Sequence, residues 1–289
     1  MGRTYIFDRA GIIFIAVLVF TFYFSVVFVS AADQPLLVYR QKAIVPQDKL
    51  TLSHDFSVSL QRGSSVYSYP FEVPNGVNGL QPDVRLTYNH QRIKGAPRIT
   101  GAGWVLSQNY VERVVDGDHY DPEKRIYFLH LNGETHELID DESDSGYTTK
   151  RKNFWHIEKF VDGVENTHGE YFVVRTKDGT TYRFGYTDNS ELTSNLYSYP
   201  IRWSLDLVND TYNNTIHYTY DEDPHTNDIG TVYPKTIAYN NDKSKRIDFT
   251  YTQTDRDNLW ETYSQGSKIK YSRLLLSLIH ISEPTRLSL

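Results

Sequence analysis

The sequence predicts an all-β protein made of antiparallel, hairpin-rich sheets. Composition is the first reason: the 289 residues include 23 Tyr and 14 Phe but one Met, and aromatic residues favour half-buried, pleated surfaces. Alternation is the second: in the segment 84–89, Val84, Leu86 and Tyr88 alternate with polar residues, at the period of a strand with one buried face. No long amphipathic helix pattern interrupts residues 56–274.

Two hairpins support the same fold class. Asn132-Gly133 separates two strand-like runs in 125–140, and Asp178-Gly179 does so in 171–186. Both dipeptides are preferred in the turns of two-residue hairpin loops. Within the second hairpin, three aromatic residues are expected on one face: Tyr182, Phe184 and Tyr186.

Residues 1–32 predict an export segment. Arg3 and Arg9 precede an apolar run from Ala10 to Val29, and small residues follow at 30–32. This pattern fits a signal peptide cleaved after residue 31 or 32, and also an uncleaved anchor, because residues 10–29 are long enough to cross a bilayer. The protein is therefore expected to be secreted or held at the cell surface. With no cysteine, its stability must come from packing and hydrogen bonds.

The remaining domain boundaries follow from changes in pattern. Residues 33–55 lack sustained alternation and are interpreted as a linker, and 56–274 as one β-rich module. The segment 276–286, LSLIHISEPTR, resembles the in-frame translation of a sequencing adapter. Residues 275–289 are therefore interpreted as an artefact, and the natural chain is expected to continue beyond residue 274, which would make the module truncated. A genuine amphipathic tail is the alternative.

Internal similarity indicates a repeated strand type. VRLTY (84–88), IHYTY (216–220) and IDFTY (247–251) share the form aliphatic-x-apolar-Thr-Tyr. YSYPFEV (67–73) is similar to YSYPIRW (197–203). The segments indicate either a repeated β unit or convergence among tyrosine-rich strands.

The stretch 69–89, YPFEVPNGVNGLQPDVRLTYN, specifies its backbone heavily and offers no evident catalytic group. Prolines fix φ and remove donors, and Gly76 and Gly79 permit turns that a Cβ would hinder. The order and spacing of the rigid residues in 67–107 resemble the N-terminal module of SpvB-type virulence proteins, of the B component of insecticidal toxin complexes and of related YD-repeat (Rhs-like) secreted proteins. The residues that carry the resemblance are Tyr69, Pro70, Val73, Pro74, Gly76, Gly79, Leu80, Gln81, Pro82, Tyr88, Asn89, Gly101, Gly103, Trp104, Leu106 and Ser107.

The resemblance covers roughly 56–274. It implies that the sheets are part of a larger β shell or barrel-like scaffold, without enzymatic activity or a cofactor of its own. It implies a C-terminal YD-repeat region or a partner subunit as the structural partner, a toxic C-terminal polypeptide as the payload, and a host-cell surface as a further partner. One departure is the segment 90–103, HQRIKGAPRITGAG, which is longer and more basic than in the family and predicts a different local loop.

Candidate reactive groups favour structural explanations. In the 125–140 hairpin, His130 and His136 are predicted to point to opposite faces, which makes them poor joint metal ligands. The acidic groups of 116–121 (DGDHYD) and 140–144 (DDESD) are interpreted as a turn and a solvated loop rather than calcium sites. The net charge of −6, with both signs interspersed, argues against a nucleic-acid partner.

Two other functions stay open. A carbohydrate-binding or adhesive β domain would use aromatic residues to stack on sugars; glycan binding lost in Trp104→Ala or Trp203→Ala would indicate it. A glycoside hydrolase would use two of the many carboxylates.

Overall fold

A computed structural model describes residues 56–59, 63–115, 125–141, 146–195, 199–257, 259–264 and 267–282. The chain divides into two compact units, 1–53 and 54–289, and all of these residues lie in the second. They form strands, turns and short 3-10 segments, with no α-helix among them. The all-β prediction is confirmed.

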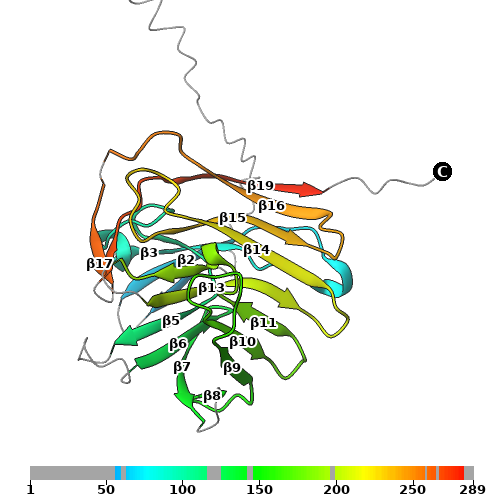
Figure 1. The fold of residues 1–289 in the computed structure, drawn as a ribbon. Helices are drawn as coiled ribbons and strands as arrows, with labels where there is room; N and C mark the ends of the chain where they lie inside the picture. The colour runs from blue at the N-terminus through cyan, green and yellow to red at the C-terminus, as the bar shows by residue number, and fades with distance from the viewer. Residues whose placement is uncertain are drawn as a thin grey trace, which may run out of the picture. The chain divides into compact units, whose positions relative to one another are not determined.

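Eight antiparallel strands close into a barrel (Figure 1). Seven follow one another as hairpins, and β13 closes the ring by pairing with both β5 and β11. The strand that closes the ring comes from later in the chain, so closure depends on non-local pairing. The strands of the barrel are β5 (Tyr110–Val115), β6 (Arg125–Leu131), β7 (Glu134–Asp140), β8 (Gly146–Thr149), β9 (His156–Phe160), β10 (Tyr171–Arg175), β11 (Thr181–Phe184) and β13 (Pro200–Asn209).

The same sheet continues beyond the barrel, because β13 also pairs with β14 along its last residues. The extension ends at an edge strand, β19, which pairs with β16 along its whole length. Its strands are β14 (Thr215–Glu222), β15 (Val232–Tyr239), β16 (Lys245–Tyr251) and β19 (Leu275–Ser282), and the short β12 (Glu191–Thr193) pairs with the start of β13.

A separate four-stranded sheet packs on this extension. Buried residues of the small sheet and its loops, such as Val84 and Leu106, belong to the same apolar core as Ile237 and Ile247 of the extension. The small sheet consists of β1 (Phe56–Ser59), β2 (Ser64–Pro70), β3 (Arg85–Asn89) and β4 (Trp104–Leu106), and β17 (Thr262–Ser264) pairs with β18 (Ser267–Ile269) in a two-stranded hairpin.

The interior of the barrel is filled by side chains. Trp203 and Phe172 have no exposed surface and meet edge to face, with ring centroids 4.9 Å apart. Tyr127 contacts both rings. An eight-stranded barrel has room for side chains rather than a channel, and these aromatic residues occupy that room.

Both predicted hairpins are present, with different turns. Asn132 and Gly133 have φ of 52° and 83°, and Leu131 pairs directly with Glu134, so this is the two-residue loop. In the second hairpin the backbone of Thr176 and Thr180 pairs across a three-residue loop, and Gly179 has φ of 83°. The two-residue prediction is wrong there, because glycine in the left-handed conformation closes a longer loop equally well.

The predicted aromatic face of this hairpin ends early. Phe184 lies in the barrel core. Tyr186 instead contacts Tyr171 and the Arg183 guanidinium, 4.1 Å from its ring centroid. The chain bends between them at Gly185, where φ is 78° and a Cβ would lie 2.2 Å from the Trp203 ring. The strand therefore stops at Phe184, and its alternation stops with it.

Several predictions fall outside the described residues. They include the export segment 1–32, the linker to residue 55, the acidic turn 116–121 and most of the loop 140–144. Within the described part, no helix is long and apolar enough to cross a membrane. Residues 275–282 belong to the segment interpreted from its sequence as an adapter-derived artefact, and in the structure they form β19.

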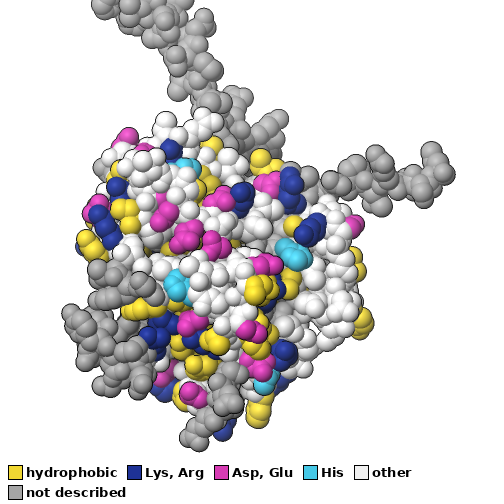
Figure 2. All heavy atoms as spheres, viewed as in Figure 1, with side chains coloured by type: hydrophobic (Ala, Val, Ile, Leu, Met, Phe, Trp, Pro, Cys, Tyr) yellow, Lys and Arg dark blue, Asp and Glu magenta, His cyan; other side chains and the backbone are white. Residues whose placement is uncertain are grey.

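Charged side chains of both signs are interspersed over the face seen in Figure 2, which carries no concentrated basic patch. The charge pattern expected from the sequence is visible on this face.

Candidate functional site

The stretch 69–89 consists of the end of β2, a docking loop (71–84) between the two sheets, and β3. After Pro70 ends β2, the chain makes a 3-10 turn at Val77–Gly79 and re-enters the small sheet as β3. The Val77 amide donates to Asn240 Oδ1 (3.0 Å), and the Tyr239 hydroxyl donates to the Pro74 carbonyl (2.9 Å). The loop is thereby fixed to β15 and the turn that follows it.

The two glycines of this loop act in different ways. Gly79 has φ of 78°, so it supplies a left-handed conformation. Gly76 has φ of −74°, which any residue can adopt, but a Cβ there would lie 1.7 Å from the Leu80 carbonyl oxygen. Other motif residues of this stretch differ in burial. Leu80 packs against the core and Pro82 is buried, whereas Tyr69 and Gln81 are exposed.

The second half of the motif joins β3 to β4. The Asn89 amide donates to the Gly103 carbonyl (2.9 Å), and the Asn89 side chain accepts from the Gln91 amide (3.0 Å). Gly101 and Gly103 have φ of 87° and 81°. Trp104 packs on Tyr88, with ring centroids 5.2 Å apart. These motif residues therefore shape the β3–β4 connection and pack against one another within the small sheet.

A buried ion pair lies at one end of the barrel interior. Arg113 is 1% exposed, and its Nη2 lies 2.8 Å from Glu170 Oε2. Lys159 Nζ lies 3.0 Å from the other oxygen of Glu170. The Arg113 guanidinium also lies 5.0 to 5.7 Å from the ring centroids of three aromatic residues, which stabilise a buried cation. These rings are Tyr127, Tyr199 and Trp203.

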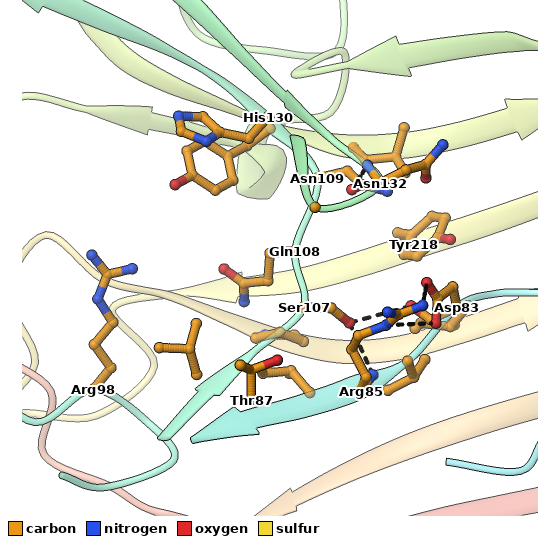
Figure 3. Close-up of a pocket in the computed structure, with 18 of the residues that line it drawn as sticks. Asp83, Arg85, Thr87, Arg98, Ser107, Gln108, Asn109, His130, Asn132 and Tyr218 are labelled. Atoms are coloured by element: carbon orange, nitrogen blue, oxygen red, sulfur yellow. Dashed lines mark hydrogen bonds and ion pairs between the residues drawn. The ribbon is translucent and has the colours of Figure 1, made fainter. Parts of the chain in front are cut away.

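A cavity of about 430 Å³ lies between β3–β4, the β6–β7 turn and strands β13–β15 (Figure 3). Asp83 and Arg85 form an ion pair at one end, and Arg98 and His130 lie at the other. Ser107 Oγ accepts from the Arg85 amide (3.0 Å) and donates to the Asp83 carbonyl (3.2 Å). At the Asp83 end the polar groups therefore satisfy one another.

At the opposite end, the lining residues Thr135 and His130 form a chain of contacts with Glu112, which lines a second cavity. Thr135 Oγ1 lies 2.9 Å from His130 Nδ1, and Glu112 Oε1 lies 2.9 Å from His130 Nε2. Burial opposes ionisation of Glu112, but His130, Arg202 and Arg98 outweigh it, so the pKa of Glu112 lies below its ordinary value. The order matches that of nucleophilic triads. Thr135 and His130 are direct cross-strand partners, which accounts for the contact as sheet packing.

His136 lies on the other face of this hairpin, as predicted. It pairs with Leu129 in the strand register and packs on Trp155, with ring centroids 4.9 Å apart. The two histidines do not form a shared site.

A third group of ionisable residues surrounds β12. Glu191 is 1% exposed, and its Oε2 accepts from the His168 amide (3.3 Å) and lies 3.1 Å from His168 Nδ1. Burial raises the pKa of Glu191 despite this contact. Burial and the nearby charges of Asp223 and Asp188 raise the pKa of Glu222 to about 7. No cluster of three or more metal-ligating side chains occurs in the described part of the chain.

Stacking on a sugar requires an exposed ring face, and neither Trp104 nor Trp203 is an exposed residue. Trp203 has no exposed surface and donates from Nε1 to the Glu170 carbonyl (2.9 Å). It is a core residue, so its ring offers no face to a sugar. Trp104 is half-buried against Tyr88. Trp260, for which the sequence predicts no role, is 54% exposed and lines a second cavity. It lies in a segment without alternation, which is the sequence signal that separates it from core aromatics.

Comparison with solved structures identifies the architecture. The N-terminal domain of the effector protein SpvB from Salmonella typhimurium strain LT2 matches with a TM-score of 0.59 at 15% identity, over 76% of this chain and 89% of that domain. This chain has the SpvB N-terminal fold. The SpvB-like fold also occurs in TcdB2-TccC3 (TM-score 0.60, 15% identity, 78% of this chain) and in the Photorhabdus luminescens Tc holotoxin pore (0.60, 15%, 78%).

This chain spans a small part of those two toxin chains, 14% of TcdB2-TccC3 and 13% of the holotoxin pore chain. No protein-family model and no curated protein sequence matches it. The SpvB-like fold is therefore shared at low sequence identity, through the pattern of strands and turns.

Proposed function

We propose that this chain is a non-enzymatic scaffold module of an exported, toxin-type protein. It serves shell formation, translocation or presentation of a toxic C-terminal polypeptide, with a C-terminal YD-repeat region or a partner subunit as its structural partner. The observation that supports this best is the SpvB-like fold, which extends over 89% of the SpvB N-terminal domain.

The interior of the molecule supports the same proposal. Fold alone does not determine function, but the barrel interior is occupied by Trp203, Phe172 and Tyr127 and by the Arg113–Glu170 pair. A packed interior suits a rigid wall element better than a substrate channel.

The natural reading frame tests the scaffold role. Long-read sequencing of the locus should show a frame that continues beyond codon 274 into further tyrosine-rich strands. Electron cryomicroscopy of that product should show a closed shell with this module in its wall. A frame that stops within a few codons of 274 would contradict the shell.

The non-enzymatic part needs its own test. The cluster Glu112–His130–Thr135 is the arrangement closest to a catalytic one. Purified chain should hydrolyse neither ester substrates nor a polysaccharide panel. Lys150→Gln is the control, because Lys150 forms an exposed ion pair with Glu137. If Glu112→Gln abolished turnover and Lys150→Gln preserved it, the module would be an enzyme.

A further inference from the structure

A second cavity of about 330 Å³ forms an open groove with aromatic walls. It lies on the outer face of β5 and β13, between the loop at 96–98 and the β17–β18 hairpin, and we call it the aromatic groove. Trp260 and Tyr263, which line it, are 54% and 68% exposed. Large aromatic side chains left this exposed beside a concave surface are typical of binding sites rather than of packing.

The floor of the aromatic groove is held rigidly. The Tyr110 ring stacks on His130 of β6, with centroids 4.3 Å apart, and the Arg202 guanidinium of β13 lies 3.8 Å from the same ring. Arg202 Nη2 donates to Gln108 Oε1 (2.6 Å), and Arg202 pairs with Glu112 in the strand register. These contacts fix the positions of the guanidinium and the carboxylate, which reduces the entropy lost on binding.

Hydrogen-bonding capacity remains at this floor. Arg202 Nε is buried and has no hydrogen-bond partner among the described residues. Arg98 is exposed and lines both cavities, and no described side chain pairs with its guanidinium. Figure 3 shows Arg98 and His130 at the same end of the larger cavity. Arg98 is close enough to Glu112 to lower the pKa of that carboxyl.

Among the described residues that line the groove, two guanidinium groups, Arg98 and Arg202, lie near one carboxylate, Glu112, so the lining carries one positive charge in excess. Guanidinium groups bind planar carboxylates with two parallel hydrogen bonds. Glu112 can accept from hydroxyl groups, and an exposed indole provides a flat apolar surface for a sugar ring. We propose that the aromatic groove binds a saccharide that carries a carboxylate, with the acidic group on Arg98 and Arg202 and the ring against Trp260.

The full chain, purified from the medium or membranes of an exporting host, should be titrated with oligogalacturonate and with its carboxyl-reduced, neutral counterpart. A second pair, sialyllactose and lactose, tests another acidic sugar. Binding to at least one acidic member is expected, at least tenfold tighter than to its neutral partner and weaker in high salt. Trp260→Ala should weaken it about tenfold, and Arg98→Gln should remove the preference for acid.

Matched controls separate the groove from the rest of the surface. Tyr212→Ala removes an aromatic side chain that is 72% exposed elsewhere, and Arg246→Gln removes an exposed arginine paired with Asp248; neither should alter binding. Absence of binding to all four saccharides overturns the proposal, as does unchanged binding in a folded Trp260→Ala. Equal binding of acidic and neutral partners overturns the carboxylate assignment. Binding of a poly-glutamate peptide without any saccharide would replace the sugar with an acidic peptide. None of these results depends on the scaffold role.

Discussion

At the scale of single residues, Gly76 shows how a missing Cβ fixes a loop. Its φ of −74° is open to alanine, yet an added Cβ would lie 1.7 Å from the Leu80 carbonyl oxygen. We expect Gly76→Ala to lower the free energy of unfolding by about 2 kcal/mol, the cost of forcing atoms into packed space. Gly95→Ala is the control, because φ is −82° and the nearest atom would be 3.4 Å away. Equal urea midpoints for the two variants would refute this explanation.

Removing either partner of the Arg113–Glu170 pair should destabilise the fold to a different extent. Glu170→Ala removes the carboxylate that both Arg113 and Lys159 contact, and it leaves a buried charge unpaired. The expected loss is roughly 3–5 kcal/mol. Arg113→Met keeps the volume, removes the charge and should cost clearly less. Denaturant unfolding followed by tryptophan fluorescence measures both, and a larger loss for Arg113→Met would contradict the argument.

Glu222 should make stability depend on pH. Its pKa is about 7 in the folded chain against an ordinary value of 4.5, through burial and the charges of Asp223, Asp188 and Glu191. Between these values the folded chain keeps a proton that the unfolded chain has lost. The free energy of unfolding therefore falls as pH rises from about 4.5 to 7, and stays lowered above that.

The variant Glu222→Gln should flatten this pH window and stabilise the chain at pH 8. Glu165→Gln, which changes an exposed carboxylate, should leave the window unchanged. Thermal unfolding at a series of pH values provides the measurement. A pH profile identical in both variants would assign the dependence to other groups.

At the scale of elements, β14 and β16 are equivalent in more than sequence. Both contain the aliphatic-x-apolar-Thr-Tyr pattern, and the register of each shifts at the Thr-Tyr step. The Tyr220 hydroxyl donates to the Leu205 carbonyl (2.7 Å), and the Tyr251 hydroxyl donates to the Pro234 carbonyl (2.6 Å). The shared bulge and hydrogen bond favour a repeated unit over convergence.

This equivalence predicts equal effects of mutation. Tyr220→Phe and Tyr251→Phe should each cost about 1 kcal/mol, the net value of a hydrogen bond, plus the penalty of the carbonyl left unpaired. Tyr88 ends the third copy, and among the described residues its hydroxyl has no partner, so Tyr88→Phe should change stability by less than about 0.5 kcal/mol. Equal losses in all three variants would show that the hydroxyls do not account for the difference.

Local chemistry made some elements predictable. Asn132-Gly133 identified its turn and register, and alternation identified β3, because both signals lie within a few residues. The loop at 177–179 was less predictable, since Asp-Gly fits turns of different length. Nothing local shows that β13 closes the barrel or that Trp203 is buried. The aromatic groove was missed for the same reason: Arg98, Arg202 and Trp260 meet only in the folded chain.

At the scale of the whole molecule, one sheet serves as both barrel and support. Its closed part has no free edge, because β11 returns to β13. Its extension carries the small sheet through a shared core. The docking loop fastens the small sheet to β15 through Pro74 and to the turn after β15 through Val77. Such an arrangement gives the rigidity that the proposed scaffold needs, and among the described strands it leaves β19 as a free edge of the large sheet.

That edge predicts how the isolated module behaves in solution. β19 exposes Leu276 and Ile279, 64% and 52% accessible, beside backbone groups that pair with no other strand on that side in the described part of the chain. A flat, apolar edge is an aggregation hazard. We expect residues 33–289 to associate with rising concentration in light scattering, and Ile279→Lys to reduce association without lowering the melting temperature. Residues 33–274 should be less soluble still, because this shorter chain lacks β19 and leaves the backbone groups along that edge of β16 unpaired. A soluble monomer of 33–274 with a cooperative thermal transition would contradict this, and would show that the module needs no neighbour along that edge.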